Sequence, residues 1–260
     1  MDVHALHSAI IGLSLSMPRL LAALTIIPLF ARNNIGGFNR AAVAAAFTVP
    51  VLPLIFSQNY AAGGMDAWIL ILIVKESVLG FMIGFVVALP FWAAEAFGFI
   101  IDNQRGAGSA SGTNAATGDE ATPLAILTYQ AYTMLFLLLG GVQLFLTLMY
   151  NSYVIWPVTS WLPEFSEGMP VYYLGLLDGL IKMTVLFAAP VMVAMLLAEL
   201  ALAFVSLFAP QLQVFFLAMP IKSGVAMFIL AVYVVILLDF MTPSVINLKD
   251  LLPVLQQVLL

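Results

Sequence analysis

The stretch ILIVKESVLGFMIGFVVALPFW, residues 71–92, decides the fold class of this chain. Its side chains are almost all apolar, and Lys75 and Glu76 are its only charged residues. A helix needs about 20 apolar residues to cross the hydrocarbon core of a bilayer. The stretch therefore predicts a membrane-spanning helix. Pro90 predicts a kink in it, because an internal proline removes a backbone hydrogen-bond donor.

The composition of the whole chain agrees with this prediction. Hydrophobic residues make up 63% of the 260 residues and charged residues only 8%, whereas a soluble domain has about 25% charged residues. Lipid or other proteins must therefore cover most of its surface. There is no cysteine, which excludes disulfides and cysteine-ligated metals. The net charge of −5 is scattered along the chain, so no nucleic-acid partner is expected.

The apolar segments predict an all-α, polytopic membrane protein with about six hydrophobic helical segments, several of them kinked or broken. The segments are 9–31, 41–57, 67–101, 124–156, 174–208 and 221–241. The second is short and contains Pro50 and Pro53, which predicts a break. The fourth would be about 50 Å long as one helix, so it either bends or lies partly outside the bilayer.

Lys75 and Glu76 are costly inside an apolar run, about 2.5–3.5 kcal/mol each at the centre of a membrane helix. They should therefore face protein. Neighbours on a helix point about 100° apart, so we do not expect the two side chains to pair well with each other. Glu76, Gly80, Gly84 and Ala88 share one face at four-residue spacing. This ridge predicts close packing against another helix, either in the same chain or in a neighbouring subunit.

A second polar pattern ends the same segment. Glu95, Gly98, Asp102 and Arg105 follow one another at steps of three, four and three, and form a stripe along one helix face. The stripe leads directly into a loop rich in Gly, Ser, Ala and Thr. It can line a wet cavity, pair with a partner, or be a simple solvated helix end.

The fifth segment contains three charged residues. Asp178 and Lys182 are four residues apart in the favourable order, which predicts that they neutralise each other locally. Glu199 has no oppositely charged residue within a helical turn. We therefore expect its partner on another helix or another chain.

Residues suited to catalysis are few. His4 and His7 are the only histidines, and the chain has no zinc-protease, nucleophile-elbow or P-loop motif. Asp119 and Glu120 have no third carboxylate beside them in sequence. The sequence therefore predicts a protein that is not an enzyme and that has no cofactor and no metal site.

Several blocks, in order, resemble one known family. They are PFWAAEAFGFIIDNQRGA (90–107), GG (140–141), NSYVIWP (151–157) and FAPQLQVFFLAMPIKSG (208–224). Their order and spacing are similar, over nearly the whole chain, to those of the export-apparatus T component of type III secretion systems. This is the SctT family, which is similar to flagellar FliR, and the blocks resemble its injectisome branch.

The resemblance implies a core subunit of an export gate that forms part of a protein-conducting pore in the bacterial inner membrane. Such a subunit is present in single copy, with several copies of components R and S, in a helical assembly within the basal body. The switch component U, the export gate V, the inner rod and needle base, unfolded secreted proteins and lipid are its implied partners.

The resemblance also divides residues 1–260, a single export-gate domain, into parts. Residues 1–165 resemble an R subunit and include a plug loop at 106–122. Residues 170–245 resemble the helical hairpin of an S subunit, and 246–260 form a C-terminal tail.

Roles for particular residues follow from the same resemblance. The implied plug residues are Gly106, Ala107, Gly108, Ser109, Ala110, Ser111, Gly112, Thr113 and Asn114. The polar stripe at the pore mouth comprises Glu95, Asp102, Gln104 and Arg105. The implied cytoplasmic hairpin turn contains Pro210, Gln211, Gln213, Pro220 and Lys222. From the residues themselves, and not from the resemblance, intersubunit packing or a buried charge is assigned to Lys75, Glu76, Gly80, Gly84, Lys182 and Glu199.

An alternative of another class is a small-solute or proton-coupled secondary transporter. In that hypothesis Lys75, Glu76 and Glu199 would be the coupling groups. Transporters of this kind are commonly built from internal repeats, and the sequence shows no convincing repeat. A test of the purified chain alone in liposomes distinguishes the two hypotheses.

Overall fold

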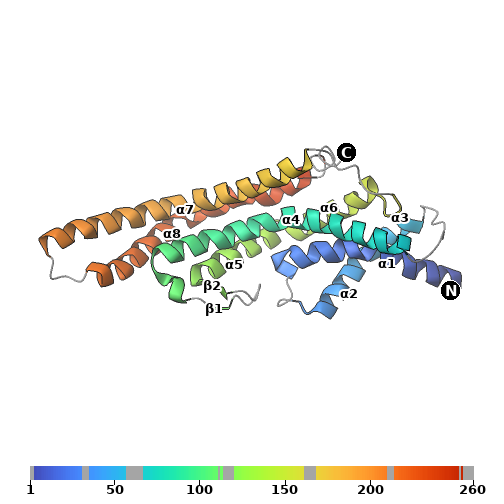
Figure 1. Cartoon of the computed structure of the whole chain (residues 1–260), viewed down its shortest axis with the longest axis horizontal. Coiled ribbons are helices and arrows are strands. Elements are labelled where there is room, and N and C mark those ends of the chain that lie inside the picture. The colour runs from blue at the N-terminus through green and yellow to red at the C-terminus, as the bar shows by residue number, and fades with distance from the viewer. Residues whose placement is uncertain are drawn as a thin grey trace.

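The computed structural model describes residues 3–30, 35–56, 67–110, 112–113, 120–160, 168–209, 214–251 and 253. Over these ranges the chain is helical apart from short connections and one pair of two-residue strands, as Figure 1 shows. The α-helices are α1 (Val3–Ile26), α2 (Gly37–Thr48), α3 (Leu52–Phe56), α4 (Ala67–Gln104), α5 (Pro123–Leu138), α6 (Gly141–Ile155), α7 (Met169–Phe208) and α8 (Val214–Ile246). Four 3₁₀ turns are η1 (Pro28–Phe30), η2 (Val49–Val51), η3 (Ala107–Ala110) and η4 (Asn247–Asp250).

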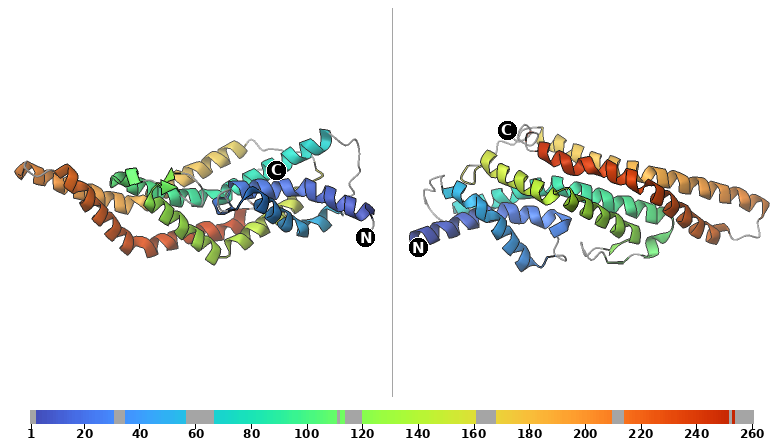
Figure 2. Two further views of the ribbon diagram at one scale, coloured as in Figure 1. Left: turned by 90° about the horizontal axis from the view of Figure 1, so that it is seen from below. Right: turned by 180° about the vertical axis from the view of Figure 1, so that it is seen from behind.

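Helix α4 is the centre of the molecule. Helix α1 packs along its first half, α5 along its second half, and α7 on a further side, while α8 packs on α7 (Figures 1 and 2). An aromatic cluster joins α4 to α5: the Phe91 ring lies 4.8 Å from the Tyr132 ring and 5.1 Å from the Phe136 ring, centroid to centroid. All three side chains are buried.

The predicted all-α membrane fold is confirmed: each of the six predicted hydrophobic segments contains helix, although not every one is long enough to span a membrane. Four stretches of the described chain are long and apolar enough to cross a membrane: Gly37–Leu54, Ile69–Gln104, Met169–Phe208 and Phe216–Asp250. The bent pair α5–α6 makes a fifth if it counts as one span. The apolar part of α1, Ile11–Ile26, is shorter than a span. The break predicted near Pro50 is the 3₁₀ turn η2.

The predicted fourth segment is broken where the two glycines stand. Helices α5 and α6 meet at an angle of 68°, and Gly140 lies between them with φ +72°. This left-handed conformation is easily adopted by glycine because it has no Cβ. The bend divides an over-long apolar run into two short helices.

Helices α7 and α8 form a long hairpin that extends past the rest of the described chain (Figure 1). With 40 residues, α7 is about 60 Å long, about twice the thickness of a bilayer core. Only 17% of its apolar window is buried within the chain, against 50% for α4. The hairpin therefore presents most of its apolar surface to lipid or to other proteins.

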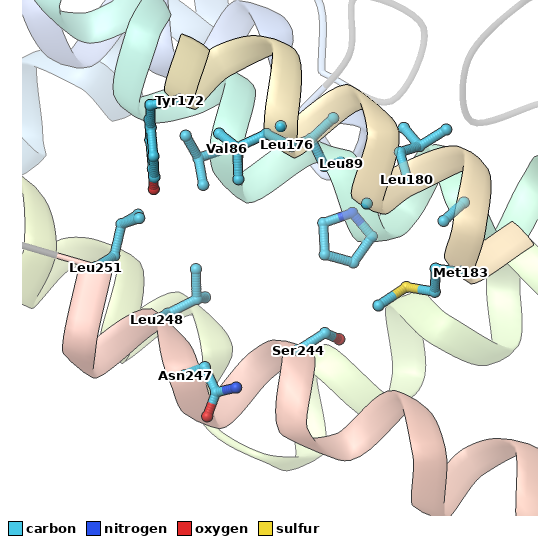
Figure 3. A pocket seen from close by; sticks show the side chains of 14 residues that line it. Val86, Leu89, Tyr172, Leu176, Leu180, Met183, Ser244, Asn247, Leu248 and Leu251 are labelled. Atoms are coloured by element: carbon cyan, nitrogen blue, oxygen red, sulfur yellow. The ribbon is translucent and has the colours of Figure 1, made fainter. Parts of the chain in front are cut away.

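A cavity of about 280 Å³ lies between α4, the first half of α7 and the end of α8 (Figure 3). Tyr172 and Leu251 lie at one end of it, and Met183 and Ser244 at the other. Its lining is almost entirely apolar.

Candidate functional site

The base of the 106–122 loop is closed by one carboxylate, Asp102 in the last turn of α4. Its side chain is fully buried. One oxygen, Oδ2, accepts a hydrogen bond of 2.7 Å from the backbone N–H of Leu124, in the first turn of α5. The other, Oδ1, lies 2.7 Å from Nε and 2.6 Å from Nη2 of Arg105. Asp102 thus fastens the start of the loop to its end.

Close backbone contact supports this closure one turn earlier on α4. A Cβ atom added to Gly98 would lie 2.6 Å from the Cα of Ala125 and 2.6 Å from the carbonyl oxygen of Leu124. Such distances are impossible for a real Cβ, so only glycine lets α4 and α5 approach this closely. We call Gly98, Asp102, Arg105 and Leu124 the loop neck.

The described part of the loop leaves α4 through a left-handed residue. Gly106 has φ +82°, and the turn η3 follows it. Farther on, Gly112–Thr113 pairs antiparallel with Glu120–Ala121. Of the nine predicted plug residues, Ser111 and Asn114 lie outside the described residues. The others belong to this exit, to η3 or to the first strand.

The loop also contacts the α7–α8 hairpin. A Cβ on Gly106 would lie 3.5 Å from Cε of Met219 on α8. Gln104 Nε2 donates a hydrogen bond of 3.3 Å to the carbonyl oxygen of Met192 on α7. Three of the predicted stripe residues, Asp102, Gln104 and Arg105, therefore have partners inside the chain. Their place at a pore mouth stays a prediction.

Glu95, the fourth stripe residue, lines a hollow beside the loop. This hollow has a volume of about 270 Å³ and is also lined by Glu120 of the second strand. Trp92, Phe99 and Ala121 form part of its wall. Two carboxylates therefore lie at a depression next to the loop neck, on α4 and on the strand that returns to α5.

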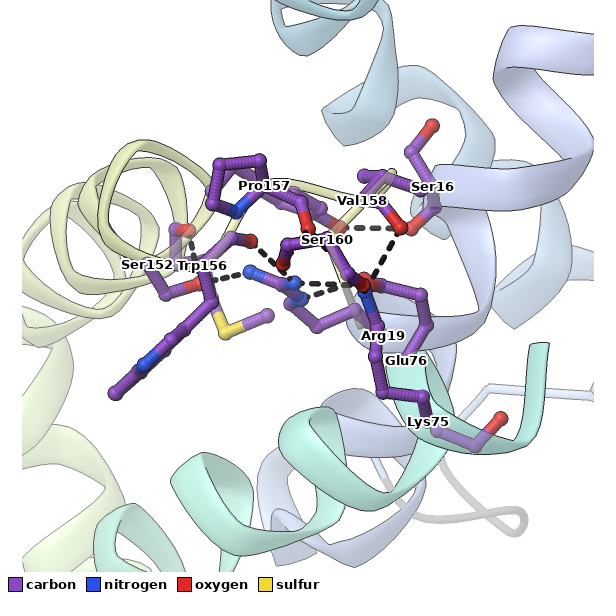
Figure 4. Close-up of polar contacts among 12 residues, drawn as sticks. Ser16, Arg19, Lys75, Glu76, Ser152, Trp156, Pro157, Val158 and Ser160 are labelled. Carbon is purple, nitrogen blue, oxygen red and sulfur yellow. Dashed lines mark hydrogen bonds and ion pairs between the residues drawn. The ribbon is translucent and has the colours of Figure 1, made fainter. Parts of the chain in front are cut away.

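A second polar cluster lies deep between α1, α4 and the end of α6, as Figure 4 shows. Arg19 and Glu76 are both fully buried and form a bidentate ion pair: Nε lies 2.6 Å from Oε2 and Nη2 lies 2.9 Å from Oε1. Arg19 also donates to Ser152 Oγ at 3.1 Å and to the carbonyl oxygen of Trp156 at 2.9 Å. Its guanidinium carbon lies 4.2 Å from the centre of the Tyr153 ring.

Lys75 belongs to the same cluster. Its Nζ lies 2.9 Å from Oε1 of Glu76, so the prediction that these neighbours do not pair well was wrong. The long lysine side chain reaches back to the carboxylate although the two Cα–Cβ bonds diverge. Nζ also donates to three carbonyl oxygens, those of Pro157, Val158 and Ser160, at 3.2, 2.8 and 3.0 Å.

The cluster holds two positive side chains and one negative. The carbonyl oxygens of residues 156–160, just past the end of α6, add partial negative charge around the two cations. Among the described residues, each charged group is thus surrounded by opposite partial or full charge (Figure 4). We call Arg19, Lys75, Glu76 and the carbonyls of 156–160 the buried charge cluster.

The glycine ridge packs within the chain. A Cβ on Gly80 would overlap the carbonyl oxygen of Arg19, and one on Gly84 would lie 2.8 Å from the Cα of Ala23. Both contacts are with the backbone of α1, and Ala88 on the same ridge is fully buried. Of the two alternatives for this ridge, the structure shows packing against a helix of the same chain.

The remaining predicted charges lie on the hairpin. Glu199 pairs with Lys222 across α7 and α8 at 3.4 Å, which is the partner expected on another helix. Asp178 and Lys182 are exposed and are not among the ion pairs of the described residues, so the local neutralisation predicted for them was wrong.

The hairpin turn is shorter than predicted. Helix α8 begins at Val214, so Pro220 and Lys222 lie inside a helix and not in a turn. Pro210, Gln211 and Gln213 lie outside the described residues. A metal site is not indicated: the described residues contain no group of three or more His, Asp or Glu side chains that could hold an ion.

Comparison with known proteins adds family information to this geometry. The model of the family described as "Bacterial export proteins, family 1" matches residues 10–247. The Yop proteins translocation protein T of Yersinia pestis is 36% identical over 250 residues, which cover 94% of this chain and 95% of that protein.

Two further relatives extend the comparison. The secretion system apparatus protein SsaT of Salmonella typhimurium is 32% identical over 82% of this chain and 83% of its own length. The flagellar biosynthetic protein FliR of Bacillus subtilis is 25% identical, with 82% of each chain covered.

Proposed function

The chain belongs to family 1 of the bacterial export proteins, and from this membership we propose that it forms part of a protein-conducting pore which its own 106–122 loop obstructs. It is a multi-pass membrane protein and a subunit of an export apparatus. We place it in the bacterial inner membrane, within the basal body of a type III secretion system. In this proposal it has no enzymatic activity, and unfolded proteins pass along a path that it helps to line.

The observation that carries the proposal is the construction of the loop neck. A loop that closes a pore must be held firmly at its base and be yielding elsewhere. Asp102 fastens both ends of the loop with a buried carboxylate. The sequence between them is rich in small residues, which have few strong side-chain anchors.

The exposed hairpin supports a place in a larger assembly. An apolar surface of this extent is covered by lipid or protein. We propose components R and S, in several copies around a single copy of this chain, as its neighbours, and components U and V nearby. In this scheme residues 1–165 resemble an R subunit and 170–245 an S subunit, followed by the tail 246–260.

The transporter alternative finds no support in the buried charges. Both oxygens of Glu76 are bound by Arg19, and one of them by Lys75 as well. A coupling carboxylate has to release its partners during each cycle. Glu199 is paired with Lys222. We therefore assign Glu76 to structure and leave it out of the export path.

Deletion of residues 107–119 tests the proposal. The deletion leaves Asp102, Arg105 and Leu124 in place, so we expect the complex with the R and S components to assemble at its normal size. We expect ion leak across the inner membrane to increase. An assembled complex with an unchanged, tight membrane would contradict the plug assignment.

A matched control replaces residues 107–119 by a Gly/Ser segment of the same length. This variant keeps the bulk of the loop and changes its side chains, so leak should stay low if obstruction depends on the presence of chain in the pore. A leak equal to that of the deletion would show that particular side chains, rather than loop volume, close the path.

A further inference from the structure

The backbone at the start of helix α5 has the geometry of a helix that is capped by a side chain. Thr122 is its N-cap, with φ −80° and ψ 156°, and Pro123 is the first helical residue. This extended backbone is the geometry in which a threonine side chain accepts a hydrogen bond from the second or third N–H of the helix. Because proline has no N–H, the first free donor is that of Leu124.

The expected cap bond is nevertheless absent among the described residues. The Thr122 hydroxyl is buried, with 1% of the residue exposed, and Oγ1 has no hydrogen-bond partner there. The Leu124 N–H is bound instead by Asp102 Oδ2 of α4, at 2.7 Å. One of the two donors that a Thr122 cap could take is thus held by the remote carboxylate, while the local hydroxyl is unused.

A buried hydroxyl without a partner is unfavourable, so this arrangement is worse for Thr122 than an ordinary N-cap. We propose that Thr122 is the alternative cap of α5 and takes the Leu124 N–H when Asp102 withdraws. The loop neck then has two hydrogen-bonded states, one fastened by Asp102 and one released and capped by Thr122.

The charges favour such an exchange. Arg105 stays beside Asp102 in either state, because its own backbone N–H is bonded to the carbonyl oxygen of Ile101 at 3.0 Å and it therefore moves with the end of α4. The carboxylate keeps its ion pair with Arg105 through Oδ1, while Oδ2 gives up its bond to Leu124. Thr122 replaces that bond at the helix end.

The inference deepens the proposed function, and it rests on that function only where release of the neck is linked to opening of the path. The exchange of caps itself is a property of α5. The exchange of caps is therefore measured at the amides of α5, separately from ion leak.

The test is a double-mutant cycle with Asp102→Ala and Thr122→Val, made in the full chain within its assembled complex. Hydrogen–deuterium exchange at the Leu124 to Ile126 amides is measured. Thr122→Val alone should leave exchange unchanged or slower, because it removes an unpaired hydroxyl. Asp102→Ala alone should accelerate it modestly, because Thr122 takes over. Exchange in the double variant should be accelerated by about fivefold more than the product of the two single accelerations, because the stabilisation by one N-cap is then lost.

Three controls make the outcome decisive. Thr128→Val removes a buried hydroxyl on the same helix that is already bonded to the Leu124 and Ala125 carbonyls, and it should combine additively with Asp102→Ala. Asp102→Asn keeps an acceptor oxygen, so combined with Thr122→Val it should exchange more slowly than the double variant with Asp102→Ala. Additive behaviour of Asp102→Ala with Thr122→Val would overturn the proposal, as would acceleration by Thr122→Val alone.

Ion leak and secretion are then measured for the same variants. Thr122→Val should lower secretion without raising leak, since the released state loses its cap. Coupled exchange with unaltered secretion would confirm the two caps and contradict the link between release of the neck and opening of the path, whereas the plug assignment itself is tested by the 107–119 deletion. The two failures are thus distinguishable.

Discussion

The buried charge cluster and the α7–α8 hairpin each join two helices by an acid–base pair, and they differ in nearly everything else. Arg19 and Glu76 are fully buried and bidentate. In the hairpin pair, 52% of the Glu199 side chain is exposed and the closest approach to Lys222 is 3.4 Å. A buried pair cannot lose one member without leaving a charge in an apolar interior. The hairpin pair is long and only partly buried, so it can exchange partners at a lower cost.

The glycines of the two regions differ in the same way. Gly80 and Gly84 on α4 and Gly175 and Gly179 on α7 have the same four-residue spacing. A Cβ on Gly80 would overlap α1, whereas one on Gly179 would meet no described atom within 4 Å. Gly175 and Gly179 instead line the apolar cavity of Figure 3. The glycine face of α4 is fully packed within the chain, whereas the glycine face of α7 borders a cavity.

The largest effect is expected from Glu76→Gln. It leaves Arg19 and Lys75 without their carboxylate, and loss of one member of a buried pair costs about 3–5 kcal/mol. We expect a large fall in the thermal stability of the purified complex and in its yield. The double variant Arg19→Met/Glu76→Met should be much closer to the unaltered protein, because Lys75 retains three carbonyl acceptors. Equal losses in the two variants would contradict the role of the cluster.

An intermediate effect is expected from Gly80→Ala. The added methyl group would displace α1, and such overpacking costs about 1–3 kcal/mol. Gly179→Ala is the matched control: it has room for the methyl group and should gain about 0.5–1 kcal/mol, as alanine generally does over glycine inside a helix. Both free energies can be compared by thermal unfolding in one detergent. A destabilising Gly179→Ala would show that the two glycine pairs are packed alike.

The smallest effect on stability is expected from Glu199→Gln. The pair is long, at 3.4 Å, and half of the Glu199 side chain is exposed in the isolated chain. An ion pair that water reaches contributes about 0–1 kcal/mol, so the unfolding temperature of the purified, isolated chain should hardly move. The same holds for Lys222→Met. A loss comparable to that of Glu76→Gln would mean that the hairpin pair is structural, and the contrast between the two regions would fail.

Much of the fold could be predicted from the sequence, because apolar length and helix breakers are local properties. The span over α4 follows from such signals, and so does a bend within the over-long fourth segment, which the structure places at Gly140. The partner of Glu76 could not be found in this way. Arg19 lies 57 residues earlier, and periodicity tells which face a residue occupies but not which helix covers it. An arginine inside an apolar run was the available signal, since such a residue requires a buried carboxylate.

The loop neck shows a related limit. The spacing of Glu95, Gly98, Asp102 and Arg105 was visible as a polar stripe, and the sequence offered a wet cavity, a partner or a solvated helix end as its reason. The structure shows that Gly98 and Asp102 face the first turn of α5. A capping carboxylate supplied by another helix leaves no signature at the cap position, where Thr122 already fits the usual preference.

The ammonium of Lys75 also imposes an order on biogenesis. Its carbonyl acceptors lie 82 to 85 residues later in the chain, so the ribosome has yet to make them when α4 first reaches the membrane. Until the end of α6 emerges, the ammonium can bind only water and Glu76 in place of these carbonyl groups. We therefore expect the first turns of α4 to stay at the water boundary during synthesis and to enter the interior late, drawn in when the turn after α6 closes around the lysine.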